Sequence, residues 1–360
     1  FIINNSKYKK KIYDRFQIDS RRIGNNQVFL SLDDDAANNL KNIKNAIKNN
    51  ASAIVTSLKI LRKDLKTSIP FIIIKDLKNI YYKIYLELVK SHKTETKIIG
   101  ITGTNGKTST SLLLANALSN IKKKVGVITS EGIGVYPTLK ENDYTTPTLD
   151  IIYKSIDRFL SLRCDYIIIE CSSQGLHQGR LKGIIFDYSI ITNIYSDHLD
   201  YHKTIKRYIN SKLMILNQSK LVFLNYLSPI LKKLDFSKFK KTKVEYIAHD
   251  KDYIECINKM YHNFVNDNAK NFHISSLLFV KSIMKAEGIK DYLIKKSISN
   301  LRVIKGRRNI IHTKKKGIFI IDYAHTTQSY EEIYNEFDTK KSITTLFGCG
   351  GDRDKTKRKI

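Results

Sequence analysis

The sequence has no long apolar stretch. Its longest apolar runs, such as FIII at 71–74 and IIFDYSIITNI at 184–194, are shorter than the roughly eighteen apolar residues that a membrane-spanning helix needs. The opening residues, FIINNSKYKKK, lack the ordered basic, apolar and small-residue zones of a signal peptide. We therefore expect a soluble protein with no membrane insertion. The chain starts with Phe1 rather than Met, which leaves open that it is a fragment.

Cysteine is also scarce. The sequence contains four, Cys164, Cys171, Cys256 and Cys349. They are scattered without any C-x-x-C spacing, so neither a disulfide framework nor a zinc knuckle is indicated. This pattern favours a cytoplasmic protein in a reducing compartment, and we expect it to be a monomer.

Acidic residues are few relative to basic ones. The 63 Lys and Arg against 34 Asp and Glu give a formal net charge of +29 and a pI near 9.7, which could indicate nucleic-acid binding. However, the lysines are spread over the whole chain among abundant Asn and Ile. No basic repeat, aromatic-rich RNA signature or zinc motif accompanies them. We interpret the charge as compositional drift and expect no nucleic-acid partner.

The order of apolar segments predicts an α/β fold. From Lys97 onward, short apolar strands alternate with helical stretches of roughly ten to fifteen residues. The predicted strands are KIIGIT, KVGVITS, DYIIIE, YSIITNI and KLVFLN. Such alternation predicts a mostly parallel sheet covered on both faces, whose ligands bind at the carboxyl ends of the strands.

Length and pattern changes predict three domains. With 360 residues and 42% hydrophobic content, the chain is long enough to bury more than one core. We assign residues 1–93 to a small α/β domain, residues 94–306 to a central domain and residues 307–360 to the start of a third. The last piece holds two predicted strands and one helix, too little for a core of its own. The third domain is therefore expected to be incomplete.

One bend carries phosphate-binding chemistry. In ITGTNGKTST at 101–110, the strand KIIGIT leads through a glycine-containing loop into a helix. Backbone N–H groups and the dipole at a helix start attract phosphate, Lys107 can reach the outer phosphates, and the Thr108 hydroxyl can bind magnesium. The usual P-loop template has a glycine where Ile101 stands. The motif favours ATP binding over a plain polar turn, but it names no reaction.

The form T-G-T-N-G-K-T resembles the loop of the Mur ligases and the related folylpolyglutamate synthetases, ATP-dependent enzymes that join an amino acid to a carboxylate. Further stretches resemble the Mur ligases that add the third amino acid of the peptidoglycan stem peptide. They are DSRRIGNNQVFLSL, ECSSQGLHQGRL, TNIYSDHLDYH, YINSKLMIL, IDYAHT and FGCGGDRDKTKR, in the order and spacing of the family. The resemblance covers about residues 19–360 and implies a three-domain Mur ligase architecture around a P-loop ATPase sheet, with a truncated C-terminal domain.

The resemblance implies a ligase of peptidoglycan biosynthesis, and hence of cell shape and division, with ATP and Mg2+ as cofactors. In that family the γ-phosphate of ATP passes to a substrate carboxylate, an amine attacks the acyl phosphate, and phosphate leaves. The implied substrates are UDP-N-acetylmuramoyl-L-alanyl-D-glutamate and a diamino acid. We favour meso-diaminopimelate over L-lysine, although the segment that distinguishes them in the family falls beyond Ile360.

The resemblance assigns residues to ATP and to the metal. The implied ATP-binding residues are Gly103, Thr104, Asn105, Gly106, Lys107, Thr108, Ser109, Arg307, Asp322 and His325. The implied magnesium ligands are Thr108, Glu170, His198 and Lys212. Lys107, His198 and Lys212 are the implied catalytic residues.

Two of these assignments differ from what the residue type suggests. An isolated His198 would more often be structural, and Lys212, which follows RYINS on a predicted helix, would be a solvated surface lysine. The resemblance implies that carbon dioxide carbamylates Lys212, which turns a cation into a carboxylate-like metal ligand. That reaction needs a lysine that loses its proton, which burial or nearby cations promote.

Further residues correspond to the family's contacts with the UDP-muramoyl peptide. Ser20 and Arg21 correspond to contacts with uridine diphosphate. The implied contacts with the muramoyl peptide are Thr145, Thr146, Ser172, Gln178 and Arg180. Arginine suits this role because its planar fork binds two oxygens of a phosphate or carboxylate at once. On residue type alone, YTTP would be a turn.

The sequence departs from the family pattern at several positions. His273 and Ser276 stand where the family has an Asn pair for adenine, although NAKN at 268–271 lies just before them. Asn309 replaces an acidic residue, and Thr327 replaces a proline. These departures leave open a degenerate nucleotide-binding relative without turnover. The shared loop also leaves open a ligase like the folylpolyglutamate synthetases.

Overall fold

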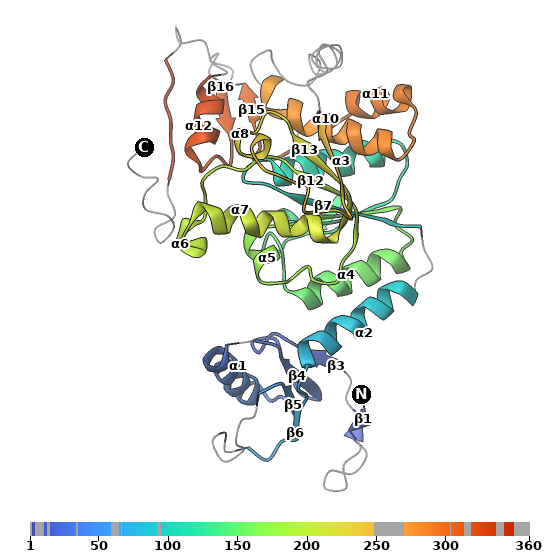
Figure 1. The fold of residues 1–360 in the computed structure, drawn as a ribbon, viewed down its shortest axis with the longest axis vertical. Coiled ribbons are helices and arrows are strands. Elements are labelled where there is room, and N and C mark those ends of the chain that lie inside the picture. Colours follow the sequence, from blue (N-terminus) through green and yellow to red (C-terminus); the bar gives the residue numbers. More distant parts are fainter. Residues whose placement is uncertain are drawn as a thin grey trace. The chain divides into compact units, whose positions relative to one another are not determined.

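The chain folds into two compact units, Phe1–Ser91 and His92–Ile360 (Figure 1). The structure is a computed structural model that describes residues 2–3, 11–12, 15–33, 35–58, 65, 67–91, 95–247, 270–302, 304–312, 318–335 and 342–348. Both units are of the α/β type, as the sequence predicts. The division into three domains stays a prediction.

The first unit is built on a parallel sheet in the order β3-β4-β5-β6. Its strands are β3 Arg15–Gln17, β4 Gln27–Ser31, β5 Ala53–Thr56 and β6 Phe71–Ile73, its helices are α1 Ala36–Lys48 and α2 Leu77–Ser91, and β1 Ile2–Ile3 pairs separately with β2 Lys11–Ile12. Asp35 caps α1 by accepting a hydrogen bond from the backbone N–H of Asn38 at 2.8 Å. The helix then buries Ile43 against Phe29 and Ile54. This contact forms the apolar core of the unit.

The second unit contains an eight-stranded sheet in the order β10-β9-β8-β11-β7-β12-β13-β14. The strands are β7 Lys97–Thr102, β8 Val125–Thr129, β9 Gly132–Val135, β10 Thr138–Lys140, β11 Tyr166–Glu170, β12 Phe186–Ile191, β13 Ser219–Asn225 and β14 Lys243–Ile247. The neighbouring strands from β8 to β14 in this order all pair in parallel. Strand β9 pairs antiparallel with both of its neighbours, β8 and β10. The mostly parallel sheet is confirmed. The hairpin and β14 are additions to the five predicted strands.

Helices cover both faces of this sheet (Figure 1). One face carries α3 Lys107–Asn120, α10 Lys270–Ala286 and α11 Asp291–Ser299, and the other carries α4 Leu149–Ser161, α5 Ser173–His177 and α7 Ile205–Leu213. Shorter pieces are α6 Leu199–His202, η2 Met214–Gln218 and α8 Pro229–Lys232. Every residue of α3 from Thr108 to Leu118 is buried, because the helix packs against the sheet and against α10. The helix that starts at the phosphate loop is therefore enclosed along most of its length.

Strand register brings three chain segments together at the carboxyl edge of the sheet. Glu170, at the end of β11, pairs with Ile101 of β7. One residue earlier, Ile169 pairs with Ile128 of β8. The segments that leave β7, β8 and β11 therefore start side by side, as expected for parallel strands.

The second unit also contains the segment that starts at 307. Its described elements are β15 Asn309–His312, β16 Ile318–Ile321 and α12 Thr327–Tyr334. Of these, β16 lies within GIFIIDYAH, where a strand is expected, whereas β15 precedes that stretch. Thr326 and Ser329 form a capping box at the start of α12.

Within the described ranges, no helix is both long enough and apolar enough to span a membrane.

Candidate active site

A cavity of about 460 Å³ lies at the carboxyl edge of the sheet in the second unit. Most of the residues predicted for the site line it: Thr104, Asn105, Gly106, Lys107, Thr108, Ser109, Thr145, Thr146, Glu170, Ser172, Arg180, His198, Lys212, Arg307, Asp322 and His325. Gly103 and Gln178 are not among the lining residues. Residues that the resemblance assigns to ATP, metal and muramoyl peptide thus share one cavity.

The phosphate loop is shaped by Gly103 and by the segment that follows β12. Gly103 has a φ of 151°, and a Cβ there would lie 1.8 Å from Oγ1 of Thr192, so only glycine fits. Thr104 donates its backbone N–H to the carbonyl of Asn193 at 3.0 Å. Its Oγ1 accepts the backbone N–H of Tyr195 at 2.9 Å. These contacts hold the loop in place against β12, with the start of α3 lining the cavity.

Lys107 is folded back onto its own loop. Its Nζ donates to the carbonyl oxygens of Gly103 at 3.0 Å and Thr104 at 2.9 Å. Burial lowers the pKa of Lys107, while the carboxylate of Glu170 opposes that shift. The loop therefore presents a partly buried cation whose present partners are neutral carbonyls, which a phosphate could replace.

Glu170 is the centre of a cluster of oxygen atoms. It is 1% exposed, and its two carboxylate oxygens accept the hydroxyl of Thr108 at 3.0 and 3.1 Å. Ser130, just after β8, donates its backbone N–H at 3.1 Å and its hydroxyl at 3.3 Å. Carboxylate and hydroxyl oxygens suit a hard divalent cation. The sequence analysis missed Ser130, and its place after a parallel strand is the only signal that could have indicated it.

Lys212 is buried, which contradicts what its residue type suggests. It lies on α7, is 1% exposed, and donates from Nζ to the carbonyl of Gly103 at 2.6 Å. Its Nζ also lies 4.7 Å from the ring centroid of Tyr208. Burial, followed by the nearby cation of Lys107, holds the pKa of Lys212 well below its usual value. The buried Lys212 and the partly buried Lys107 thus donate to one carbonyl oxygen.

His198 is placed by the buried carboxylate beside it. Its backbone is left-handed, with a φ of 53°, and its N–H donates to Oδ1 of Asp197 at 2.8 Å. The other oxygen of Asp197 lies 3.5 Å from Nε2 of His198 and 3.7 Å from Nε2 of His325. The sequence analysis did not single out Asp197, although it directly precedes His198 in the DHLD stretch.

The expected metal ligands include few of the usual types. In the described part of the chain, no group of three or more His, Cys, Asp and Glu is arranged to hold a metal ion. The expected set contains only Glu170 and His198 of these types, with a threonine and a lysine besides. The oxygen atoms around Glu170 fit a divalent cation. The ammonium of Lys212 fits one only after conversion to an anion.

The predicted contacts to the muramoyl peptide are tied to the end of β11. Thr146 donates its hydroxyl to the carbonyl of Glu170 at 2.7 Å and accepts the backbone N–H of Ser172 at 2.8 Å. Arg180 donates from Nη1 to the carbonyl of Thr146 at 2.7 Å and from Nε to Oε1 of Gln178 at 2.8 Å. Thr145 lines the cavity beside them. YTTP is therefore more than a turn, because it connects Arg180 to Glu170.

The segment from 307 onward contacts the phosphate loop. Nη2 of Arg307 lies 3.5 Å from Oγ1 of Thr108 and 3.5 Å from Oε1 of Glu131. The amide of Asn105 donates to Oγ1 of Thr326 at 3.0 Å, at the start of α12. Asp322 lines the same cavity. The phosphate loop, the segment after β8 and the segment from 307 onward therefore all line the same cavity.

Some residues named in the sequence analysis are not among those that line this cavity. Ser20 and Arg21 belong to the first unit, where Arg21 donates twice to Asp19, both times at 2.9 Å. Ser276 is buried and accepts the hydroxyl of Thr110 at 2.9 Å, so it joins α10 to α3. The side chain of His273 and the NAKN stretch fall outside what the structure describes.

Comparison with known proteins places this geometry in context. Residues 101–287 match the family model described as Mur ligase middle domain. A UDP-N-acetylmuramoyl-L-alanyl-D-glutamate--2,6-diaminopimelate ligase of Fusobacterium nucleatum is 30% identical, with 97% of this chain and 74% of the relative covered. The protein of that name from Helicobacter pylori is 32% identical over 78% of this chain and 66% of the relative.

Solved structures show the same fold. A UDP-N-acetylmuramoyl-L-alanyl-D-glutamate--2,6-diaminopimelate ligase has a TM-score of 0.65 at 22% identity, covering 96% of this chain and 74% of that chain. The MurF ligase of Thermotoga maritima in complex with ADP has a TM-score of 0.58 at 15% identity, over 89% and 74%. Escherichia coli FolC with DHPP and ADP has a TM-score of 0.53 at 16% identity, over 73% and 70%. The fold is thus shared with ligases whose structures contain a nucleotide.

Proposed function

Because this chain belongs to the Mur ligase family, we propose that it joins meso-diaminopimelate to UDP-N-acetylmuramoyl-L-alanyl-D-glutamate in an ATP-dependent reaction of peptidoglycan biosynthesis. Relatives named for this reaction match 97% and 96% of the chain, and it spans 74% and 75% of their lengths. The observation that carries the proposal is the single cavity shared by the phosphate loop, Glu170, Lys212 and Arg180. A cytoplasmic location and a monomeric state are part of the proposal.

The first physical problem of this reaction is to bring ATP and a carboxylate together. Both are anions, and their repulsion is strongest where water is excluded. Lys107 and Arg307 both line the cavity, although they lie far apart in the sequence. In the proposal, the phosphates of ATP replace the loop carbonyls as acceptors for Lys107. Arg307 adds a second cation over the same site.

Mg2+ fits the oxygen atoms around Glu170. Thr108, Ser130 and Glu170 would contribute oxygen ligands, with His198 and carbamylated Lys212 as the further ligands that the family resemblance assigns. When bound, the ion would withdraw electron density from phosphoryl oxygens and reduce the repulsion between the two substrates. The backbone N–H of Ser130 keeps the Glu170 carboxylate oriented toward Thr108.

Burial of Lys212 supports its carbamylation. The neutral amine adds to the carbon of carbon dioxide, forms an N–C bond and loses one proton to solvent, so that an anionic carbamate replaces the cation. Enclosure and the neighbouring Lys107 both favour the neutral amine that this step needs. The resulting carbamate would also place a negative charge next to the cation of Lys107.

The muramoyl-peptide contacts would orient the acceptor carboxylate. In the proposal, Arg180 binds an anionic group of this substrate, with Thr145, Thr146 and Ser172 beside it, while Ser20 and Arg21 of the first unit bind uridine diphosphate. The carboxylate attacks the γ-phosphorus and ADP leaves. The amine of diaminopimelate then attacks the acyl carbon, loses a proton, and phosphate leaves as the amide forms. The site orients the reactants and stabilises the developing charge.

Phosphate release tests the proposal. Wild-type protein would be mixed with ATP, Mg2+, UDP-N-acetylmuramoyl-L-alanyl-D-glutamate and either meso-diaminopimelate or L-lysine. We expect release that depends on both the nucleotide sugar and the diamino acid, faster with diaminopimelate. ATP binding without release would instead support a degenerate nucleotide-binding relative. Release with folate and glutamate substrates would support the folylpolyglutamate reaction.

A further inference from the structure

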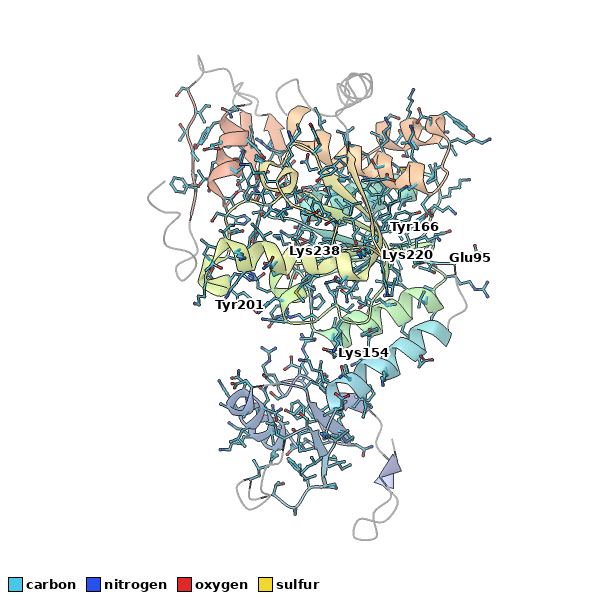
Figure 2. The ribbon with its side chains drawn as sticks, viewed as in Figure 1. Glu95, Lys154, Tyr166, Tyr201, Lys220 and Lys238 are labelled. Atoms are coloured by element: carbon cyan, nitrogen blue, oxygen red, sulfur yellow. The ribbon has the colours of Figure 1, made fainter. Side chains whose placement is uncertain are left out.

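Tyr201, labelled in Figure 2, links the helix after His198 to the arginine of the muramoyl-peptide contacts. It lies on α6, and its hydroxyl is 2.9 Å from Nδ1 of His177 and 3.1 Å from Nε2 of Gln178. Gln178 in turn contacts Arg180. Neither the motifs nor the family resemblance assigned Tyr201 a role.

Chemistry sets the direction of the two hydrogen bonds that connect Arg180 to Tyr201. A guanidinium only donates, so the amide oxygen of Gln178 has to face Nε of Arg180. The amide nitrogen of Gln178 therefore faces Tyr201 and donates to its hydroxyl oxygen. Tyr201 then has its own proton available for Nδ1 of His177. The sequence of donors runs from Arg180 through Gln178 to Tyr201, with no competing arrangement.

This chain of bonds restricts Arg180. Its Nε is held by Gln178 and its Nη1 by the carbonyl of Thr146 at 2.7 Å, and the residue lines the cavity. Within the described ranges, no protein atom accepts from its Nη2. An arginine held at two nitrogens has little rotamer freedom left to lose when it binds an anion.

From this geometry, we infer that Tyr201 is a positioning residue for the acceptor substrate, acting through Gln178 on Arg180. The inference rests on the proposed function, because it takes the anionic group bound by Arg180 to belong to the nucleotide-sugar dipeptide. Tyr201 is placed by the same short helix that begins after His198. The start of α6 thus places His198, a proposed metal ligand, and the same helix places Tyr201, which is connected to Arg180.

The test is the Tyr201→Phe variant of the full chain, which deletes one hydroxyl and keeps the ring against His202, 4.7 Å away between centroids. Gln178 is exposed, so water partly replaces the lost bond. We therefore expect the Kd of UDP-N-acetylmuramoyl-L-alanyl-D-glutamate to rise about three- to tenfold. The Kd of ATP should stay within about twofold. In turnover, KM for the dipeptide substrate rises while kcat is retained.

A double-mutant cycle separates positioning from general packing. If Tyr201 acts through Gln178, adding Tyr201→Phe to Gln178→Leu should weaken substrate binding by less than about twofold more. Tyr188→Phe is the matched control, because it removes a tyrosine hydroxyl that donates to Glu287, and it should leave both Kd values unchanged.

Several outcomes would overturn the inference. Substrate binding by Tyr201→Phe within twofold of wild type would do so, as would equal weakening of ATP binding or full additivity in the cycle. Absence of dipeptide binding by the wild-type chain would overturn the proposed function, and the inference with it. Wild-type binding with an unaffected Tyr201→Phe variant would overturn the inference alone.

Discussion

The two ends of strand β11 each hold a carboxylate that accepts hydrogen bonds from hydroxyl groups. At the amino end, Tyr166 and Tyr188 donate to the two oxygens of Glu287 at 2.9 and 2.5 Å. At the carboxyl end, Glu170 accepts from Thr108 and from a serine. The local chemistry is similar, yet Glu170 lines the 460 Å³ cavity and Glu287 is not among its lining residues.

The two edges of the sheet differ in the partners of their lysine side chains. Near the amino edge, Lys220 pairs with Asp187 at 2.7 Å and Lys123 with Asp165 at 3.0 Å, all with exposed or partly exposed side chains. At the carboxyl edge, the buried Lys212 and the partly buried Lys107 donate to one carbonyl oxygen, and the buried carboxylates of Glu170 and Asp197 lie near them. Buried charge is costly and is common at functional sites. A hydrogen-bonded carboxylate alone therefore does not mark a site, whereas its convergence with buried cations on a cavity does.

The two carboxylates should respond very differently to the same substitution. Glu170→Gln should lower turnover by about 10³-fold, because it removes the negative charge expected to hold the metal. Glu287→Gln should leave turnover within about twofold, since it acts only on the contact between α10 and the sheet. Phosphate release at saturating substrates, with thermal unfolding as the folding control, measures both. Equal losses would remove the distinction between the two ends of β11.

The two ends should also differ in how their lysines respond. Lys212→Ala should reduce turnover by about 10²-fold or more, because alanine cannot supply the metal ligand that carbamylated Lys212 is proposed to provide. Lys220→Ala, which removes an exposed ion pair, should have almost no effect. Wild-type turnover should fall when bicarbonate is removed, whereas residual turnover of Lys212→Ala should not respond. Full activity of Lys212→Ala, or bicarbonate-independent wild-type turnover, would exclude carbamylation.

Backbone strain gives a third contrast. Gly103→Ala should lower the free energy of unfolding by about 2–4 kcal/mol and weaken ATP binding, because its Cβ would collide with Thr192. Gly288→Ala, at a φ of 70° with open space around it, should cost only about 1 kcal/mol and leave ATP binding unchanged. Urea denaturation and ATP titration measure the two effects. A Gly103→Ala protein that binds ATP normally would show that the loop tolerates another shape.

The smallest expected effect concerns His202, which lies near the carboxyl edge and contacts Oγ of Ser173 at 3.0 Å. Burial lowers the pKa of His202 to about 4, below the value of about 6.5 in the unfolded chain. Between these values the unfolded state binds more protons, so stability is lost as the pH falls from 6.5 towards 4. His202→Gln should flatten this loss by on the order of 2 kcal/mol. Denaturation midpoints at pH 7 and 4.5 measure it, and parallel profiles for both proteins would contradict the assignment.

Much of the frame was predictable from the sequence. The five predicted strands all form, because each is a short apolar run buried between helices. Residues of the ITGTNGKTST loop line the cavity because a strand, a glycine bend and a helix start specify that local structure by themselves.

Ser130, Asp197 and Tyr201 could not be predicted in this way. Ser130 reaches Glu170 only because β8 lies next to β11, a pairing between residues about forty positions apart. Tyr201 reaches Gln178 only because side chains on α6 contact side chains at the end of α5. No local pattern distinguishes such a serine or tyrosine from others on loops and helix ends.

The sequence by itself determined the phosphate loop, the alternation of strands and helices, and the family that the chain belongs to, because each depends on short-range spacing and residue type. Only the tertiary structure decided which charges are buried. Lys212 is a surface lysine by residue type and a buried one by position, since α7 packs it against the carbonyl of Gly103. Burial depends on contacts between distant segments, and those contacts determine which lysine loses its proton most readily.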